Sequence, residues 1–363
     1  MPTLAAPALP NADATVCPIT ELGVLHCSGD DALQFLQSQL SNDFALLGHD
    51  SARLAAYLSA KGRMQASFIG VRLGPTDVLL LVHRSVLAAV QKRLSMFILR
   101  AKVRLSDASA QWQLHGLLGQ AAIEQAISAT LAADAANAAD AAGNASPAPT
   151  LLAPWQAVAN AAARSGAAAG AAPAWVIGLY PAAGQPRALH IAPSGSAAGL
   201  PATQPPPQAS AAWACSEVLA GVATISAPVA ELFVPQMLNY ESVGGVSFKK
   251  GCYPGQEVVA RSQFRGVIKR RAFLASGQAA HLPEPGAEIF TAGEPDQPCG
   301  VLVQSAWHGQ AEASGSGPRP FAAIVSLKTD CASQPLQLAA TAADDDATPL
   351  QIQPMPYPIL DDV

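Results

Sequence analysis

Five short apolar runs, separated by glycine and proline, follow residue 270. They read RAFLAS, AEIFTAG, CGVLVQSA, FAAIVSL and LQIQPMPYP. Short apolar runs that are bounded by turn residues are typical of the antiparallel strands in barrels and sandwiches. The last part of the chain is therefore predicted to form a small antiparallel β-barrel or sandwich.

The first part of the chain has a different pattern, in which strands and helices alternate. ITELGVLHCSG predicts a strand, and the segment after it predicts a helix that is capped by Ser28. RLAAYLSAKGRMQASFIGVRL predicts two strands joined at residues 60–62, and DVLLLVH predicts a buried strand. RSVLAAVQKRL predicts a helix capped by Ser85, which precedes another strand. This order favours an α+β fold with antiparallel sheets.

Changes in composition divide the chain into four segments. Residues 1–15 are rich in proline and alanine and are expected to form a flexible N-terminus. Residues 16–118 are expected to form a first α+β subdomain, and residues 119–245 a second one. Residues 246–363 contain a basic stretch and the predicted barrel.

Two stretches inside the second subdomain are rich in small residues. Residues 120–150 are dominated by alanine, and residues 193–212 by proline, alanine, glycine and serine. We interpret both as insertions or flexible loops, although an alanine-rich run is also compatible with a helix.

The overall composition narrows the possible functions. The chain has 363 residues, 13% of them charged, and a net charge of −5, which argues against a protein that coats nucleic acid. No uncharged apolar run approaches the ~18 residues that a membrane helix needs. The N-terminus lacks the basic and apolar regions of a signal peptide. The six cysteines have no metal-ligand spacing, and we interpret them as reduced thiols of a cytoplasmic protein.

One stretch, FKKGCYPGQEVVARSQFRGVIKRR at residues 248–271, concentrates positive charge around a thiol. A third of the 21 basic residues of the chain lie in it, namely Lys249, Lys250, Arg261, Arg265, Lys269, Arg270 and Arg271. Such a cluster creates a local field that favours anions. Cations beside Cys252 favour its thiolate, which is the form that attacks electrophiles, ligates metals or senses redox state. The stretch therefore predicts an anion site with a functional thiol.

Composition alone leaves plainer interpretations open. A single cysteine is more often a small buried apolar residue than a reactive one, and a basic run is most often a solvated surface. Glu257 and Arg261 lie one helical turn apart, so they are able to pair with each other. Tyr253 is compatible with a packing role.

The order of residues in this region is more specific than its composition. FVPQMLNYESVGGVSFKKGCYPGQEVVAR resembles the signature of the YgfZ-type folate-binding proteins, which reads roughly K-G-C-Y-x-G-Q-E. FLQSQLSND and AYLSAKGRMQASF resemble the first domain of the same family, so the resemblance covers about residues 16–110 and 213–310. The family is related to the aminomethyltransferase, or T-protein, of the glycine cleavage system.

The resemblance implies three subdomains in a ring around a central cavity that binds tetrahydrofolate. It also implies an accessory role in the assembly or maintenance of iron–sulfur clusters in a subset of enzymes, including enzymes that modify tRNA. The expected partners are folate and iron–sulfur client or assembly proteins. Neither a membrane nor direct contact with nucleic acid is expected.

The resemblance assigns roles to individual residues. Cys252 is expected to be the functional thiol, with Lys250 and Tyr253 beside it. Glu241 is expected to hold the pterin, because a carboxylate accepts both hydrogen bonds from the two-donor edge of that ring. The basic stretch is expected to face the anionic glutamate tail of folate. Further residues expected to bind the cofactor are Asn239, Lys249, Gln256, Glu257 and Arg261; no metal ligands are expected.

The sequence departs from the T-protein at one position. Where the T-protein has its catalytic aspartate, this chain has Gln65, and the next acidic residue is Asp77. Two alternatives to the accessory role stay open. One is a folate-dependent one-carbon transferase, against which Gln65 speaks. The other is a protein that binds or modifies tRNA directly, which needs a wider basic face.

Overall fold

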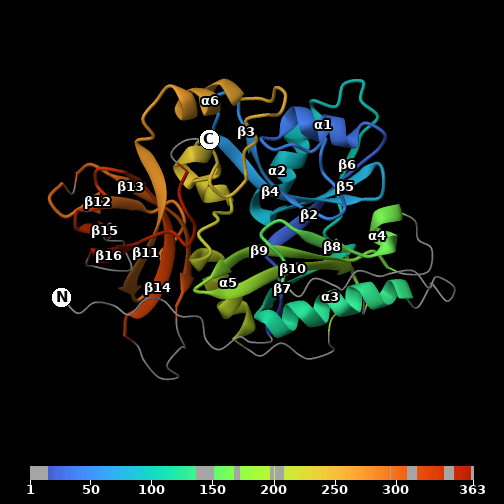
Figure 1. Ribbon diagram of the computed structural model, residues 1–363. Coiled ribbons are helices and arrows are strands. Elements are labelled where there is room, and N and C mark those ends of the chain that lie inside the picture. Colours follow the sequence, from blue (N-terminus) through green and yellow to red (C-terminus); the bar gives the residue numbers. More distant parts are fainter. Residues whose placement is uncertain are drawn as a thin grey trace.

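The computed structural model describes residues 15–135, 151–166, 172–196, 200, 208–294, 296–308, 317–338 and 347–360. Within these residues, two five-stranded sheets lie beside one closed six-stranded barrel (Figure 1). The pairing of neighbouring strands is antiparallel throughout both sheets and the barrel. The predicted α+β class and the predicted C-terminal barrel are confirmed.

The first sheet has the strand order β3-β4-β5-β2-β6. Helices α1 (Ala32–Gln39) and α2 (Arg84–Ser95) cover its outer face, where their apolar sides join those of the strands in one core. These elements are the ones that the sequence pattern predicted. The strands are β2 (Leu22–Ser28), β3 (Arg53–Leu58), β4 (Met64–Leu73), β5 (Asp77–His83) and β6 (Arg104–Asp107).

The predicted caps of these two helices are wrong. Helix α1 begins only after a turn at Gly29, whose φ is 121°, so Ser28 lies too far from the helix to cap it. Helix α2 is capped by the ring of His83, which accepts a hydrogen bond from the backbone N–H of Ser85. The hydroxyl of Ser85 instead accepts a hydrogen bond from the N–H of Ala227 at 2.9 Å.

The second sheet has the order β1-β7-β10-β9-β8 and packs face to face on the first sheet. Helix α3 (Gln120–Ala135) covers its outer face, so that α1 and α2 lie on one side of the two sheets and α3 on the other (Figure 1). Strands β1 and β7, which were expected in the first subdomain, pair in this second sheet. The strands are β1 (Thr15–Pro18), β7 (Trp112–Leu118), β8 (Ala157–Ala159), β9 (Trp175–Ala182) and β10 (Gln185–Pro193); helix α4 (Ala161–Ser165) follows β8.

Helix α3 corrects the interpretation of residues 120–135 as part of a flexible insertion. Ile123 and Ile127 lie one turn apart and are buried against the sheet. Alanine has the highest helix propensity and lets the helix lie close to the strands, so the alanine-rich run forms a packed element. Residues 209–212 likewise begin helix α5 (Ala209–Leu219). The rest of the predicted insertions lies largely outside the described residues.

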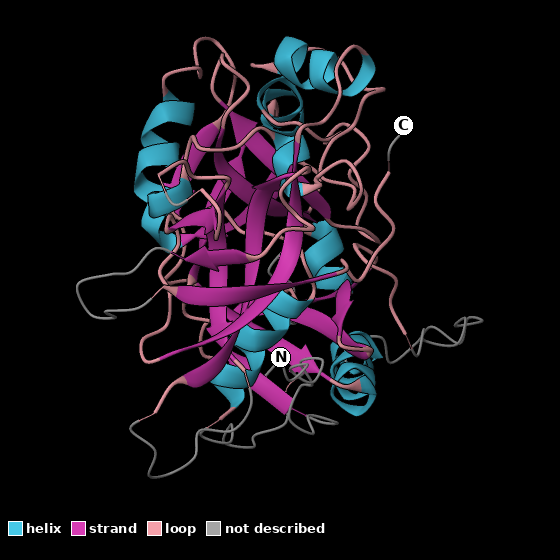
Figure 2. Ribbon diagram, turned by 90° about the vertical axis from the view of Figure 1, so that its left-hand side faces the viewer, coloured by secondary structure: helices cyan, strands magenta, loops and turns pink. Residues whose placement is uncertain are grey.

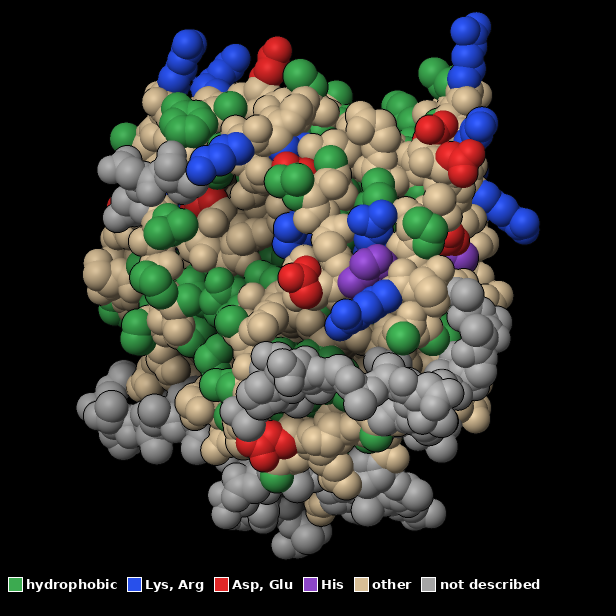
Figure 3. Space-filling view, turned by 45° about the vertical axis from the view of Figure 1, so that its right-hand side comes forward, with side chains coloured by type: hydrophobic (Ala, Val, Ile, Leu, Met, Phe, Trp, Pro, Cys, Tyr) green, Lys and Arg blue, Asp and Glu red, His purple; other side chains and the backbone are tan. Residues whose placement is uncertain are grey.

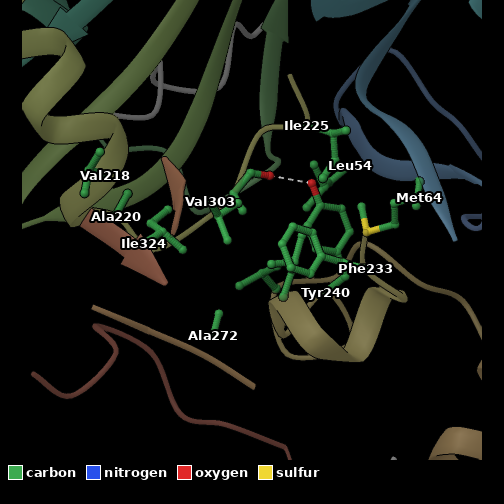
Figure 4. Packing of buried hydrophobic residues seen from close by; sticks show 14 of the residues in the cluster. Leu54, Met64, Val218, Ala220, Ile225, Phe233, Tyr240, Ala272, Val303 and Ile324 are labelled. Carbon is green, nitrogen blue, oxygen red and sulfur yellow. Dashed lines mark hydrogen bonds between the residues drawn. The ribbon is translucent and has the colours of Figure 1, made fainter. Parts of the chain in front are cut away.

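The barrel has the order β11-β14-β13-β12-β15-β16 and encloses its own apolar core. A larger core joins it to α5, to β3 and β4, and to the 3-10 helices η1 (Ala227–Val229) and η2 (Pro235–Leu238). Figure 4 shows Leu54, Met64 and Phe233 around the ring of Tyr240 in this core. The barrel strands are β11 (Arg270–Ala279), β12 (Glu288–Thr291), β13 (Gly300–Trp307), β14 (Arg319–Lys328), β15 (Leu336–Leu338) and β16 (Thr348–Gln353).

Helix α6 (Gln256–Phe264) lies between η2 and the start of the barrel and contains part of the basic stretch. Figure 2 shows the strands running through the middle of the molecule, with the helices around them. The basic stretch therefore lies beside η2 and the residues 59–62 that join β3 to β4, and it ends in the first barrel strand.

Candidate functional site

Glu241 lies in the interior, in the turn that follows η2. Its side chain is shielded from solvent, and Nη1 of Arg271 donates a hydrogen bond to its Oε1 over 2.7 Å. The preceding Asn239 adopts a left-handed conformation with φ of 55°, and its amide donates to the carbonyl of Ala272 at 3.0 Å. Because a buried carboxylate is costly without a partner, Arg271 is what allows Glu241 to occupy this position.

The segment after β16 lies against this ion pair. Nη2 of Arg271 donates to the carbonyl of Leu360 at 3.1 Å, and the N–H of Leu360 donates to the hydroxyl of Ser242 at 3.0 Å. Tyr357 is buried, and its hydroxyl donates to the carbonyl of Gly221 at 2.8 Å. Residues 355–360 therefore run past the Glu241–Arg271 pair.

A small cavity of about 50 Å³ lies between the two sheets and α5. Its wall contains a buried ion pair between Arg187 and Glu217, and the guanidinium of Arg187 lies 4.6 Å from the ring centre of Trp213. Trp155 and Tyr180 also line it, with ring centres 6.1 Å apart. The cavity is thus aromatic, with one cation and one carboxylate in its wall.

A second, open cavity of about 470 Å³ adjoins the first, because Leu22, Trp213, Glu217 and Thr224 line both. The open cavity reaches the barrel through residues 282–285 and 303–305. The two cavities together occupy the junction of both sheets and the barrel.

Lys250 anchors the signature loop to helix α1. Its Nζ donates to the backbone carbonyls of Gln37 and, at 2.5 Å, of Leu40. The last carbonyls of a helix lack intrahelical partners and carry partial negative charge, and the ammonium group complements both properties. Burial lowers the pKa of Lys250 to about 8, while Asp43 and Cys252 act in the opposite direction. Lys250 therefore has a structural role in addition to any role beside the thiol.

Cys252 is exposed, whereas the other five cysteines are buried or half-buried. Burial raises the pKa of both Cys17 and Cys27 to about 12 and that of Cys215 to about 11. Accessibility therefore distinguishes Cys252 from the other thiols. The neighbouring Tyr253 points inward, and burial raises its pKa to about 12.

The glycines of the two segments that carry the family resemblance pack against each other. Gly255 precedes α6 with a φ of 78°, and a Cβ atom there would lie 2.6 Å from the carbonyl oxygen of Ser59 and 2.8 Å from Cα of Gly62. A side chain at either glycine would separate the turn at residues 59–62 from the start of α6. Gln256 and Glu257 form the first turn of this helix, and Glu257 is exposed.

The rest of the basic stretch lines a groove of about 740 Å³ between α6, η2 and the end of β14. The groove contains one carboxylate group, from Asp330, among its described lining residues. The groove thus gathers several cations in one place. On the face of the molecule that Figure 3 shows, by contrast, Lys and Arg side chains occur in small separate groups. The basic residues that line the groove are Arg261, Arg265, Lys269, Arg270 and Lys328.

The structure thus divides the predicted site residues among three places. Asn239 and Glu241 lie in the interior with Arg271; Lys249, Lys250, Cys252 and Tyr253 form the loop beside α1; and Arg261 lies in the groove. Gln65 donates to Glu231 at 2.5 Å and lines neither of the two central cavities.

Sequence reasoning did not find Arg187, Glu217, Trp155, Tyr180 or Tyr357. Arg187 and Glu217 pair across 30 residues, between β10 and α5, and no local motif predicts such a pair. Within the residues that the structure describes, no group of three or more His, Cys, Asp or Glu side chains is placed to hold a metal ion. No helix in the described part of the chain is long and apolar enough to cross a membrane.

Comparison with known proteins supports a relationship in sequence and in fold. No protein-family model matches the chain. It is 47% identical over 81 residues to the tRNA-modifying protein YgfZ of Cronobacter sakazakii (strain ATCC BAA-894), a match that covers 22% of this chain and 25% of that protein. The match therefore spans about a quarter of the length of that relative.

The fold is similar to that of the glycine cleavage system aminomethyltransferase T from Bartonella henselae. The TM-score is 0.53 at 15% identity, over 96% of this chain and 87% of that one. A similarity to the heterotetrameric sarcosine oxidase from Corynebacterium sp. U-96, with a TM-score of 0.30, supports no conclusion. Over 81 residues the chain is therefore similar in sequence to YgfZ, and its fold is similar to that of the glycine cleavage aminomethyltransferase T.

Proposed function

We propose that the chain is a tetrahydrofolate-binding accessory protein of the cytoplasm. It would support the assembly or maintenance of iron–sulfur clusters in a subset of enzymes, including enzymes that modify tRNA. The observation that carries the proposal is the buried carboxylate of Glu241, which is held by Arg271 in a T-protein fold, while Arg271 also donates to Oδ1 of Asn239. The relative named as a tRNA-modifying protein supports the link to tRNA modification.

Glu241 provides the chemistry that a pterin requires. A carboxylate accepts two hydrogen bonds from the 2-amino and N3–H donors of the ring, and the shielded position strengthens both. Asn239 adds an amide, and Trp155 and Tyr180 add aromatic surface nearby. The donor set therefore fits the ring, and Glu241 is its anchor.

The anionic tail of folate fits the basic groove better than the open cavity. The groove carries five cations and begins at Arg270, one residue before Arg271. The open cavity is lined by Glu21, Glu217 and Glu284, which would repel a chain of glutamates. Arg261 and its neighbours are thus proposed to bind the tail, as the sequence predicts. Lys249, Gln256 and Glu257 stay further candidates at the adjoining end of α6.

Cys252 is proposed to act outward, on a partner protein. It is exposed beside Lys250, whereas Glu241 is buried, so the thiol and the pterin anchor face different environments. Such an arrangement suits an accessory protein that binds folate inside and contacts its client at the surface.

Calorimetric titration with tetrahydrofolate tests the cofactor assignment. Glu241→Gln keeps the size of the side chain but removes the charge, and we expect affinity to fall by about 1–3 kcal/mol, or roughly 5- to 150-fold. Glu288→Gln, an exposed change on the barrel strand β12, is the matched control and should bind like the wild type. Equal affinity of all three proteins would remove Glu241 from the site. No binding by the wild type would refute the cofactor assignment.

The cluster-related role needs a separate measurement in cells. Cells that lack the protein are expected to lose a cluster-dependent methylthiolation of tRNA, and the wild-type gene should restore it. Restoration by a Glu241→Gln variant that no longer binds folate would disconnect folate from this role.

A further inference from the structure

Tyr357 lies between the small central cavity and Glu241. On one side its ring packs edge-on against Tyr180, a cavity-lining residue, with ring centres 5.5 Å apart. On the other side the same segment reaches the Glu241–Arg271 pair, because Nη2 of Arg271 donates to the carbonyl of Leu360 and the N–H of Leu360 donates to the hydroxyl of Ser242. The cavity, Tyr180, Tyr357 and Glu241 therefore follow one another through the interior.

The cavity as it stands is too small for a pterin. Its volume is about 50 Å³. One water molecule needs roughly 10–15 Å³ of such a cavity, so there is room for only a few. A ring bound to Glu241 has to take space that is now occupied. Residues 355–360, with the ring of Tyr357 packed on Tyr180, occupy space between this cavity and the Glu241–Arg271 pair.

Tyr357 resembles a ligand in the contacts that it makes. It is a flat aromatic ring with a donor at its tip, and that donor binds the carbonyl of Gly221. A Cβ atom on Gly221 would lie 2.7 Å from Met355 and 3.1 Å from the ring of Tyr357, so the glycine permits this close approach. The slot therefore offers a backbone carbonyl and an aromatic neighbour to a flat ring that carries a hydrogen-bond donor.

We propose that residues 355–360 are an intramolecular plug, in which Tyr357 occupies the slot for a flat heterocycle with a hydrogen-bond donor edge. Ligand binding then requires the plug to leave, and the plug lowers the apparent affinity in proportion to the time that it spends in the slot. The identity of the ligand as a pterin rests on the proposed function. The existence of the slot and of its tethered occupant does not.

The attachment of the segment is compatible with release. It follows the last barrel strand and is held near the slot by the hydrogen bonds of Tyr357 and Leu360. Pro356, Pro358 and Leu360 are exposed, so the release of the segment frees one buried side chain, Tyr357. Segments with few buried contacts open at low free-energy cost.

The first experiment compares folate affinity with and without the plug. Tyr357→Ala and a chain that ends at residue 354 should both bind tetrahydrofolate at least ~10-fold more tightly than the wild type. Pro354→Ala, an exposed change just before the segment, should bind like the wild type. Unchanged or weaker binding by both plug variants would overturn the proposal and make the segment a wall of the site. Tyr357→Phe, which keeps the ring, serves as a second variant if the truncated chain does not fold.

The second experiment does not depend on folate. A synthetic peptide with the sequence PMPYPIL, residues 354–360, should bind to the truncated chain, as measured by fluorescence anisotropy of a labelled peptide. The same peptide with alanine in place of Tyr357 should not bind. If the peptide binds but no variant binds tetrahydrofolate, the plug proposal is supported and the folate assignment is refuted. A peptide that fails to bind a folded truncated chain would overturn the plug.

Discussion

Arg271 and Glu241 form a buried ion pair, and the same guanidinium that holds the carboxylate also binds the carbonyl of Leu360. Three parts of the chain meet at this one side chain: the turn after η2, the first barrel strand and the C-terminal segment. A change at Arg271 is therefore expected to affect stability as well as ligand binding.

Arg271→Met should lower the free energy of unfolding by about 3–5 kcal/mol, because it removes the guanidinium that pairs with the buried carboxylate of Glu241. The double change Arg271→Met with Glu241→Leu should recover a large part of that loss, since it removes both charges. Urea unfolding of the wild type, the two single variants and the double variant gives the free energies for this double-mutant cycle. Arg261→Met, in the exposed groove, is the control and should change stability by less than ~0.5 kcal/mol. A double variant as unstable as the sum of the single ones would show that the two residues are not coupled.

Lys250 should make the stability of the protein rise with pH between about 8 and 10.5. The folded-state pKa is about 8, below the ordinary value of 10.5, so in this window the unfolded chain holds a proton that the folded chain has lost. The gain over the whole window is on the order of 3 kcal/mol. Thermal unfolding of the wild type and of Lys250→Met is measured from pH 7 to 10.5. As the pH rises, the unfolding temperature of the wild type should increase relative to that of Lys250→Met. Lys249→Met, an exposed neighbour, should show no such shift. A constant difference between wild type and Lys250→Met would contradict the buried position of the ammonium.

Cys252 should react with iodoacetamide faster than the other five thiols. It is exposed, and burial raises the pKa of Cys17, Cys27 and Cys215 well above neutrality. Mass spectrometry of the labelled chain gives the rate at each position. Cys252→Ser should fold, should bind folate nearly as well as the wild type, and should fail to restore the cluster-dependent methylthiolation in cells. Full restoration by Cys252→Ser would move the function away from the thiol.

Ile127→Ala should destabilise the protein by about 2–4 kcal/mol, because it opens a cavity between α3 and the second sheet. Ser128→Ala, the exposed neighbour on the same helix, should change stability by less than ~0.5 kcal/mol. Chemical unfolding measures both. Hydrogen exchange adds an independent check, since the amides of residues 124–131 should be protected. Rapid exchange there would restore the interpretation of this run as a loop.

Local patterns in the sequence predicted much of the fold. The strands of the first sheet follow from short apolar runs and from the glycines and prolines between them, and so do the barrel strands except β15, which no predicted run covers. These signals depend on residues only a few positions apart, so they do not depend on how distant parts of the chain are arranged. The signature around Cys252 is local in the same sense, and it predicted the relationship to the T-protein fold.

The alanine-rich helix α3 shows where local patterns stop being sufficient. The sequence of residues 120–135 was compatible with both a loop and a helix, and burial of Ile123 and Ile127 against the sheet decided for the helix. The membership of β1 and β7 in the second sheet was decided in the same way, by pairing with β10, which lies far along the chain.

The division of the basic stretch into three places was decided by tertiary structure alone. In sequence the seven cations form one run, but successive residues of a strand point to opposite faces. Arg270 therefore lines the groove while Arg271 turns inward to Glu241, and Lys250 binds carbonyls of α1 that lie more than 200 residues earlier. The sequence by itself determined which charges and which thiol the protein has. Packing between distant segments determined which of them meet, because such contacts depend on the whole folded chain and leave no trace in the spacing of neighbouring residues.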